Sequence, residues 1–258
     1  MSFDLQRIDS ETFVRKIEFH SKLPSTNDLA MTLAEAVEIV LPLLVLCEQQ
    51  TAGRGRGGNH WWSSDGALTF SLVVEAGSLS FLVNHPTCVS LSAGLAVCET
   101  LSEVFSSEKI GLKWPNDVYL EGKKVCGILT ESPSPRSGRL ILGIGINVNN
   151  SLRTAPSELQ SLATSLCDES GKQFELTDLL VRTIQHLEKQ IKSLQRDDSQ
   201  HFKSWQQFCV LQGRSVTLDL GSEQLTGICS GIDVEGHLIL QTEAGPRHFS
   251  NGVVSLID

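Results

Sequence analysis

Apolar residues follow two different spacings along this chain, and each spacing predicts one kind of element. Short apolar runs predict strands over residues 17–19, 43–47, 68–75, 110–114, 118–120, 124–130 and 139–147. Apolar residues that recur every three or four positions predict helices over residues 26–40, 88–105 and 177–194, with a short helix around Trp205. The pattern therefore predicts an α+β fold in which a sheet packs against helices.

Polar residues and glycines mark the ends of several of these elements. Ser25 or Thr26 is the expected N-cap of the first helix, whose apolar spacing continues to Val40. Thr177 is the expected cap of the long helix that follows it. Gly122 is expected to supply a positive φ angle in a hairpin turn. The helix over residues 88–105 is expected to be amphipathic, with one buried face.

The pattern changes near residue 213. Short strands separated by glycine turns follow there, at residues 216–220, 225–229, 238–240 and 253–257. This spacing is typical of a small five-stranded barrel. We therefore expect two domains, with residues 1–210 forming the larger one and residues 211–258 the smaller one.

Composition and charge narrow the possible functions. The chain has 258 residues, of which 40% are hydrophobic, so it can bury a substantial core. Its formal net charge is −9, which argues against a general attraction to nucleic acid or to anionic membranes. The seven cysteines form no CxxC pair, and no apolar stretch reads as a signal peptide or membrane span. These features predict a cytoplasmic protein with reduced thiols.

One glycine-rich stretch carries the clearest chemical signal. Residues 48–62 place Arg54 and Arg56 among the glycines Gly53, Gly55, Gly57 and Gly58. Glycines allow backbone N–H groups to turn inward around an anion, and arginine side chains match phosphate or carboxylate oxygens. A solvated surface loop and an RNA-binding Arg-Gly run remain alternatives at this point.

A second group of polar residues lies at the end of a predicted strand. Lys113, Asn116 and Asp117 are followed across a tight hairpin by Lys124. The two lysines could converge with the arginines of the loop on one anion, and Asp117 could fix a lysine or lie near a divalent metal. Ordinary surface lysines in a hairpin would give the same pattern.

Several common catalytic motifs are missing from the sequence. It contains no Walker loop, no dinucleotide-binding GxGxxG and no HExxH metal motif. The run from Gly143 to Asn147 is expected to be a strand, in which Gly143 and Gly145 allow close approach by a ligand or neighbouring backbone.

Taken together, five motifs resemble those of the biotin protein ligases, the biotin–[acetyl-CoA-carboxylase] ligase family. They occur in order along the whole chain at residues 25–27, 50–61, 113–117, 124–131 and 143–147. The resemblance implies a mixed β-sheet flanked by helices, related to the class II aminoacyl-tRNA synthetases, with a C-terminal SH3-like barrel. It also implies a stand-alone form without an N-terminal DNA-binding domain.

The resemblance implies a reaction in two steps. The biotin carboxylate attacks the α-phosphate of MgATP, which gives biotinyl-5′-AMP and pyrophosphate. A lysine of the biotin carboxyl carrier protein of acetyl-CoA carboxylase then attacks the acyl-adenylate and releases AMP. The expected small molecules are biotin, ATP and Mg²⁺. No nucleic-acid or membrane partner is implied, and the family permits a monomer or a homodimer.

The resemblance also assigns residues, motif by motif. Residues similar to the biotin contacts are Ser25, Thr26, Asn27, Gln50, Gly53, Gly55, Trp61 and Gly127. Residues similar to the ATP contacts are Arg54, Arg56, Trp61, Asn116, Asp117, Lys124 and Asn147. The expected catalytic cations are Lys124, Arg54, Arg56 and Lys113, and Asp117 is the expected magnesium ligand.

The sequence departs from the family pattern within the glycine loop. Gly57, Asn59 and His60 stand where many members carry further basic residues. The loop is therefore expected to close less tightly, or His60 to replace part of the missing charge. A lipoate-type acyl-adenylate ligase and a non-catalytic biotin-binding regulator are the alternative functions. The Arg-Gly loop and the motif from Lys113 to Asp117 favour the biotin ligase.

Overall fold

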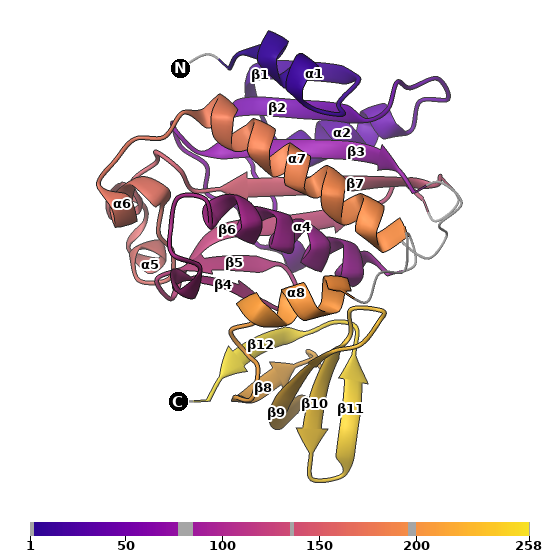
Figure 1. Cartoon of the computed structure of the whole chain (residues 1–258), viewed down its shortest axis with the longest axis vertical. Helices are drawn as coiled ribbons and strands as arrows, with labels where there is room; N and C mark the ends of the chain where they lie inside the picture. Colours follow the sequence, from indigo (N-terminus) through magenta and orange to yellow (C-terminus); the bar gives the residue numbers. More distant parts are fainter. Residues whose placement is uncertain (1–2, 77–84, 135–136, 196–199, 258) are drawn as a thin grey trace.

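The computed structural model describes residues 3–76, 85–134, 137–195 and 200–257 (Figure 1). Its larger sheet has seven strands in the order β1-β2-β3-β7-β6-β5-β4. Only β1 and β2 pair in parallel, so the predicted mixed sheet is confirmed. The strand bounds are β1 Lys16–Leu23, β2 Leu43–Gln50, β3 Leu68–Glu75, β4 Ile110–Lys113, β5 Asp117–Leu120, β6 Lys123–Glu131 and β7 Arg139–Ile146.

Helices cover the two faces of this sheet unequally. The long helices α4 (Pro86–Leu101) and α7 (Leu176–Gln195) lie on one face, where most of the core is buried (Figure 1). Helix α2 (Thr26–Ala34) packs on the other face against β2, β3 and β7. The remaining helical segments are α1 Leu5–Glu11, η1 Arg56–Gly58, η2 Ser107–Lys109, η3 Leu152–Thr154, α5 Ser157–Gln160, α6 Leu166–Ser170 and α8 Gln200–Phe208. No helix in the described ranges is long and apolar enough to cross a membrane.

Strand β7 places different side chains on the two faces of the sheet. Leu140, Leu142 and Ile144 point into the main core, because side chains alternate along a strand. Gly143 and Gly145 alternate with them and therefore face the side of α2. The predicted strand is confirmed, and its glycines leave space on that side.

The C-terminal region is a five-stranded antiparallel sheet in the order β11-β10-β9-β8-β12. Its strands are β8 Ser215–Asp219, β9 Gln224–Ile232, β10 Leu238–Thr242, β11 Gly245–Phe249 and β12 Val253–Leu256. Alternate residues such as Val216, Leu218 and Leu240 are buried. The sheet lies beyond α8 in Figure 1 and is consistent with the predicted SH3-like domain.

Two predictions about helix ends need correction. Helix α2 begins at its confirmed N-cap, Ser25, but ends at Ala34, and Val37 is 94% exposed. The helix stops early because the Arg139 guanidinium binds the carbonyl groups of Ala34 and Ala36, both at 2.6 Å. The apolar spacing through Val40 is therefore coincidental.

Thr177 does not cap the long helix as predicted. Glu175 accepts from the backbone N–H groups of Thr177 and Asp178 at 2.8 and 2.6 Å, and so takes that role at the start of α7. The Thr177 hydroxyl instead accepts from the backbone N–H of Asp4. A cap that depends on a contact with the N-terminal segment is not visible from local sequence.

Helix α4 is buried on all sides, which corrects the prediction of an amphipathic helix with one buried face. Leu91, Leu95 and Leu101 are buried, as are the small residues Ser92 and Ala93. The helix lies between the sheet and the helices α7 and α8, so small polar side chains also face protein. The hydroxyl of Ser92 is satisfied by donating to the carbonyl of Cys88 at 2.8 Å.

We predict that the packing of α7 on α4 is sensitive to pH through His186. Its ring nitrogens lie 3.0 Å from Glu99 and 3.0 Å from Glu103, and these contacts, that to Glu99 first, raise the pKa of His186 against the effect of burial. A raised pKa stabilises the fold fully below the unfolded value of about 6.5, and this stability is lost as pH rises through the folded value.

His186→Gln should therefore cost about 1–2 kcal/mol of unfolding free energy at pH 6, and clearly less at pH 9. Urea denaturation at the two pH values measures the difference. Lys192→Gln, which removes an exposed pair with Glu188, is the control and should cost the same at both. An equal cost for His186→Gln at both pH values would show that the imidazolium contributes nothing.

Candidate active site

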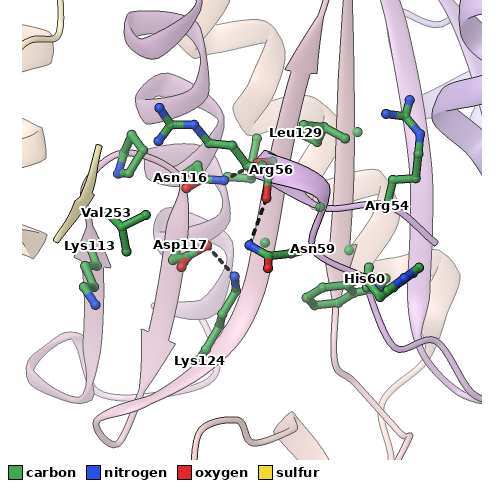
Figure 2. A pocket seen from close by; sticks show the side chains of 18 of the residues that line it. Arg54, Arg56, Asn59, His60, Lys113, Asn116, Asp117, Lys124, Leu129 and Val253 are labelled. Atoms are coloured by element: carbon green, nitrogen blue, oxygen red, sulfur yellow. Dashed lines mark hydrogen bonds and ion pairs between the residues drawn. The ribbon is translucent and has the colours of Figure 1, made fainter. Parts of the chain in front are cut away.

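A cavity of about 630 Å³ opens on the side of the sheet to which Gly143 and Gly145 point (Figure 2). It is lined by the N-terminus of α2, the glycine loop, the segment from Lys113 to Asp117 and strands β6 and β7. The C-terminal sheet contributes the remaining wall. Motifs that are far apart in the sequence therefore meet around one space.

Three glycines line the floor of the cavity, and neighbouring side chains leave no room for a Cβ atom at two of them and little room at the third. A Cβ on Gly143 would overlap the Asn27 amide, and one on Gly145 would lie 2.6 Å from Nε1 of Trp61. A Cβ on Gly127 would lie 3.2 Å from the same indole ring. The predicted close approach is confirmed, but the neighbours are side chains of this chain rather than backbone.

One end of the cavity is lined by neutral polar side chains, which belong to a buried hydrogen-bond network that ends on the Glu131 carboxylate. The backbone N–H of Thr26 donates to Oε1 of Gln50 at 2.7 Å, and the Thr26 hydroxyl donates to the same oxygen at 3.1 Å. Ser71 donates to Oδ1 of Asn27 at 2.5 Å, and Nδ2 of Asn27 donates to Glu131 at 2.8 Å. Thr26 and Asn27 are each only 4% exposed. Such a network holds its donors and acceptors in fixed positions for a polar ligand.

Trp61 forms the wall between the two ends of the cavity. Its ring lies over Gly127 and Gly145, and its Nε1 is buried without an acceptor in the described part of the chain. A buried donor without a partner is costly in the folded state. The indole N–H lies against Gly145 and is closed off from the cavity in this structure, so the rest of the Trp61 side chain supplies the lining.

The other end of the cavity is cationic. Nζ of Lys124 lies 2.6 Å from Oδ1 of Asp117, and Figure 2 shows the two side chains directed at one another. Arg56 and Lys113 also line this end, and burial lowers the pKa of both, with Asp117 acting in the opposite sense. Three cations outnumber the two carboxylates that line the cavity, Asp117 and Asp219, so the site favours an added anion.

Arg54 lies apart from this group. Its Nε donates to Asp28 at 2.7 Å, and its two terminal nitrogens bind Glu131 at 3.1 and 2.7 Å. These contacts, led by that to Glu131, raise the pKa of Arg54. Figure 2 shows Arg54 and Lys113 on opposite sides of the cavity. In this structure Arg54 therefore fastens the glycine loop to α2 and β6.

The structure brings together most of the residues that the sequence singled out. Of the fifteen residues assigned to the site, thirteen line the cavity: Ser25, Thr26, Asn27, Gln50, Arg54, Gly55, Arg56, Trp61, Lys113, Asn116, Asp117, Lys124 and Gly127.

Gly53 and Asn147 are not among the residues that line the cavity. The carbonyl of Gly53 accepts from the backbone N–H of Trp61 at 2.9 Å, so this glycine pairs the two ends of the loop. Asn147 is buried, donates to the carbonyl of Thr164 at 3.1 Å and accepts from Asn150 at 3.0 Å. Its amide supports the chain behind β7 rather than facing the cavity.

Sequence reasoning missed two kinds of site residue. Asp28 and Glu131 bind Arg54. Asp28 directly follows the motif at residues 25–27, and Glu131 ends the motif at residues 124–131, so the sequence could have indicated both as site residues. The contribution of the C-terminal sheet carried no such signal, although Gly252 accepts from Nη1 of Arg56 at 3.3 Å and Val253 lines the cavity. Contacts between distant segments of this kind appear only in the folded chain.

The fold and the cavity define a class of ligand-binding protein whose site joins a neutral polar end to a cationic end. Comparison with known proteins makes the assignment specific. Residues 21–149 match the model of the biotin/lipoate A/B protein ligase family, and residues 212–257 match that of the biotin protein ligase C-terminal domain. The chain belongs to the biotin/lipoate A/B protein ligase family.

Individual relatives support this membership over nearly the whole chain. A biotin–[acetyl-CoA-carboxylase] ligase of Mycobacterium tuberculosis is 32% identical, covering 88% of this chain and 83% of its own length. The bifunctional ligase/repressor BirA of Escherichia coli is 27% identical, and the chain spans 65% of its length. The biotin protein ligase from Aquifex aeolicus in complex with biotin and ATP superposes with a TM-score of 0.80 at 30% identity, covering 94% of this chain and 99% of that one.

A double-mutant cycle tests the contact between Trp61 and the glycine floor. Gly145→Ala should cost about 1–3 kcal/mol of unfolding free energy in the wild type, because the added methyl overlaps the indole ring. In a Trp61→Ala background the same substitution should cost less than about 0.5 kcal/mol, since the ring is gone. Equal costs in the two backgrounds, measured by urea denaturation, would contradict the contact.

Proposed function

We propose that this protein is an ATP-dependent ligase that activates biotin as biotinyl-5′-AMP and transfers it to a lysine of a biotin carboxyl carrier protein. The observation that carries the proposal is the division of one cavity into a neutral polar end and a cationic end. The polar end, formed by Ser25, Thr26, Asn27 and Gln50, suits the uncharged ureido ring of biotin. The names of the relatives support this choice of substrate and, for the carrier, acetyl-CoA carboxylase.

The cationic end suits the first chemical step. A carboxylate must approach a triphosphate, so negative charge accumulates between the two reactants. Lys124, Arg56 and Lys113 would stabilise that charge, and one well-placed donor contributes about 3–4 kcal/mol. Lys124 would exchange its contact with Asp117 for one with the α-phosphate. The second step needs no nucleophile from the enzyme, because the carrier lysine attacks the adenylate directly.

The residues fit a magnesium ion that arrives with the triphosphate. Asp117 and Asp219 are the only acids among the residues that line the cavity, and Asp117 is already paired with Lys124. Mg²⁺ commonly takes one or two carboxylates and completes its shell with phosphate and water. Asp117 would therefore supply one ligand, and the bound ion would neutralise triphosphate charge.

The proposal extends to the remaining parts of the molecule. We assign residues 1–210 to the catalytic domain and residues 211–258 to the C-terminal domain, which the matched model of residues 212–257 supports. Trp61, Gly127 and Gly55 are proposed to contact biotin, and Asn116 the ATP phosphates. The cysteine pattern supports a cytoplasmic location, and the partners are the carrier protein, biotin and ATP, with the protein acting as a monomer or a homodimer.

The proposal is tested by pyrophosphate exchange into ATP. The purified chain should catalyse exchange that depends on biotin, and lipoate at the same concentration should support little of it. Exchange that depends on lipoate would identify the lipoate-type alternative. Biotin binding without exchange would identify a non-catalytic regulator.

Lys124→Ala should lower the biotin-dependent exchange rate by roughly a hundredfold or more while changing biotin affinity little, because its charge acts where transition-state charge develops. Lys123→Ala is the matched control, since the neighbouring Lys123 is exposed and lies outside the cavity. Circular dichroism confirms that both variants fold. A rate for Lys124→Ala within a few-fold of wild type would remove Lys124 from the catalytic group.

Arg56→Gly should separate the formation of the adenylate from its retention. The substitution removes a partly buried cation and its contact with Gly252, which together hold the loop against the C-terminal sheet. Loss of a charge-assisted contact of about 1.5–3 kcal/mol would open the loop by one to two powers of ten and release biotinyl-AMP.

Labelling of the carrier domain and of an unrelated bystander protein, followed in one mixture, measures this release. The ratio of carrier to bystander labelling should fall in Arg56→Gly and stay at the wild-type value in Arg153→Gly, whose side chain is 79% exposed. An unchanged ratio in Arg56→Gly would show that another group retains the intermediate.

A further inference from the structure

A group of histidines and acids lies where the C-terminal sheet meets α4, outside the proposed catalytic group. The turn at residues 233–237 connects β9 to β10 and packs against the start of α4. Figure 1 shows the start of β10 at the end of the small sheet that faces α8 and α4. The start of α4 and the turn at residues 233–237 are therefore neighbours here, although they are far apart in the sequence.

Two contacts hold this turn in place. Nε1 of the buried Trp114 donates to the carbonyl of Gly236 at 3.0 Å. A Cβ atom on Gly236 would lie 2.8 Å from the backbone of Cys88, so the turn lies directly on the first turn of α4. The side chains next to this contact therefore extend from rigid elements. A preorganised binding site requires such rigidity.

His85, Glu235 and His237 each offer one ligand atom, and these atoms all lie within 4.8 Å of one another. Oε2 of Glu235 is 3.4 Å from Nδ1 of His237 and 4.0 Å from Nδ1 of His85. Ligands at 2.0–2.1 Å from a tetrahedral zinc ion are about 3.4 Å apart. Small side-chain movements would therefore bring all three atoms to one ion.

Asp233 supports the same arrangement. Its Oδ1 accepts from the backbone N–H groups of Glu235 and His237 at 3.0 and 2.9 Å, which fixes the turn that carries both ligands. Its Oδ2 lies 3.3 Å from Nδ1 of His237 and 2.7 Å from Nδ1 of His248. Asp233 therefore fixes the turn through Oδ1 and places negative charge beside the same ring nitrogen of His237 that faces Glu235.

We propose that His85, Glu235 and His237 bind one zinc ion, with Asp233 as a supporting carboxylate, and that the ion fastens the C-terminal sheet to α4. Two imidazoles and a carboxylate suit Zn²⁺, whereas the Mg²⁺ of the proposed reaction prefers oxygen ligands alone. An adjoining cavity of about 360 Å³ is lined by His85, Glu235, His237, Arg56 and Asn116, among others. The bound ion would thus also stabilise the sheet that Arg56 contacts.

The test uses the full chain without a polyhistidine tag, freed of metal by chelation and then titrated with Zn²⁺ alone. Calorimetry should show one ion per chain at micromolar affinity or tighter, and zinc should raise the melting temperature. His85→Ala and His237→Ala should each weaken binding at least tenfold and remove the thermal shift. His186→Ala is the matched control, because His186 also lies between two glutamates, and it should bind zinc as the wild type does.

Titration with Co²⁺ identifies the ligands even if a variant folds poorly. The wild type should develop the visible absorption of four- or five-coordinate cobalt without a thiolate charge-transfer band, since no cysteine belongs to the group. A thiolate band would place the metal on cysteines and overturn the proposal. Zinc binding that is no tighter in the wild type than in His85→Ala/His237→Ala would show that the group forms ion pairs only.

Discussion

Strand β7 must present two opposite surfaces, and the rest of the structure depends on this. Its large residues Leu140, Leu142 and Ile144 enter the core beneath α4, and Gly143 and Gly145 alternate with them on the other side. The same alternation sets the roles of its neighbours, since Ser71 pairs with Gly143 and Gly127 pairs with Gly145. The sheet therefore gains stability from one face and leaves room for a cavity on the other.

The two arginines of the glycine loop illustrate how environment separates similar residues. Arg54 is held by Asp28 and Glu131, and its pKa is raised, so its charge is already compensated. Arg56, two positions later, lies against a backbone carbonyl, and burial lowers its pKa. Arg56 therefore has more electrostatic energy to gain from an incoming anion than Arg54 has. We infer that Arg54 positions the loop, while Arg56 meets the ligand.

The elements that could be predicted from sequence are those whose signal is local. The strands of the sheet, the Ser25 cap and the Gly122 turn, with φ of +78°, each follow from neighbouring residues. The early end of α2 could not be predicted, because Arg139 reaches it from β7. The burial of α4 on all sides could not be predicted either. Its small side chains are typical of a solvent-exposed helix face, and only the folded chain shows that α7 packs over them.

In the candidate site, too, the features with a local sequence signal could be predicted and those that depend on distant segments could not. Thirteen of the fifteen residues that the motifs assigned to the site line the cavity, because each motif carries its chemistry in a few consecutive positions. The motifs could not show that Arg54 is already paired, that Asn147 faces away, or that Gly252 and Val253 close the cavity. Those facts depend on where separate segments meet, which one sequence does not specify.

We propose that Lys124, Arg56 and Lys113 form a cationic end that binds the phosphate of an acyl-adenylate. A crystal structure of the chain with a non-hydrolysable biotinyl-adenylate analogue would show whether they do. We expect Nζ of Lys124 to leave Asp117, from which it is 2.6 Å away in the present structure, and to bind the phosphate analogue. We also expect the ureido ring to lie at Thr26, Asn27 and Gln50. A structure in which Lys124 keeps its pair with Asp117 and the adenylate phosphate lies away from all three cations would contradict the proposal.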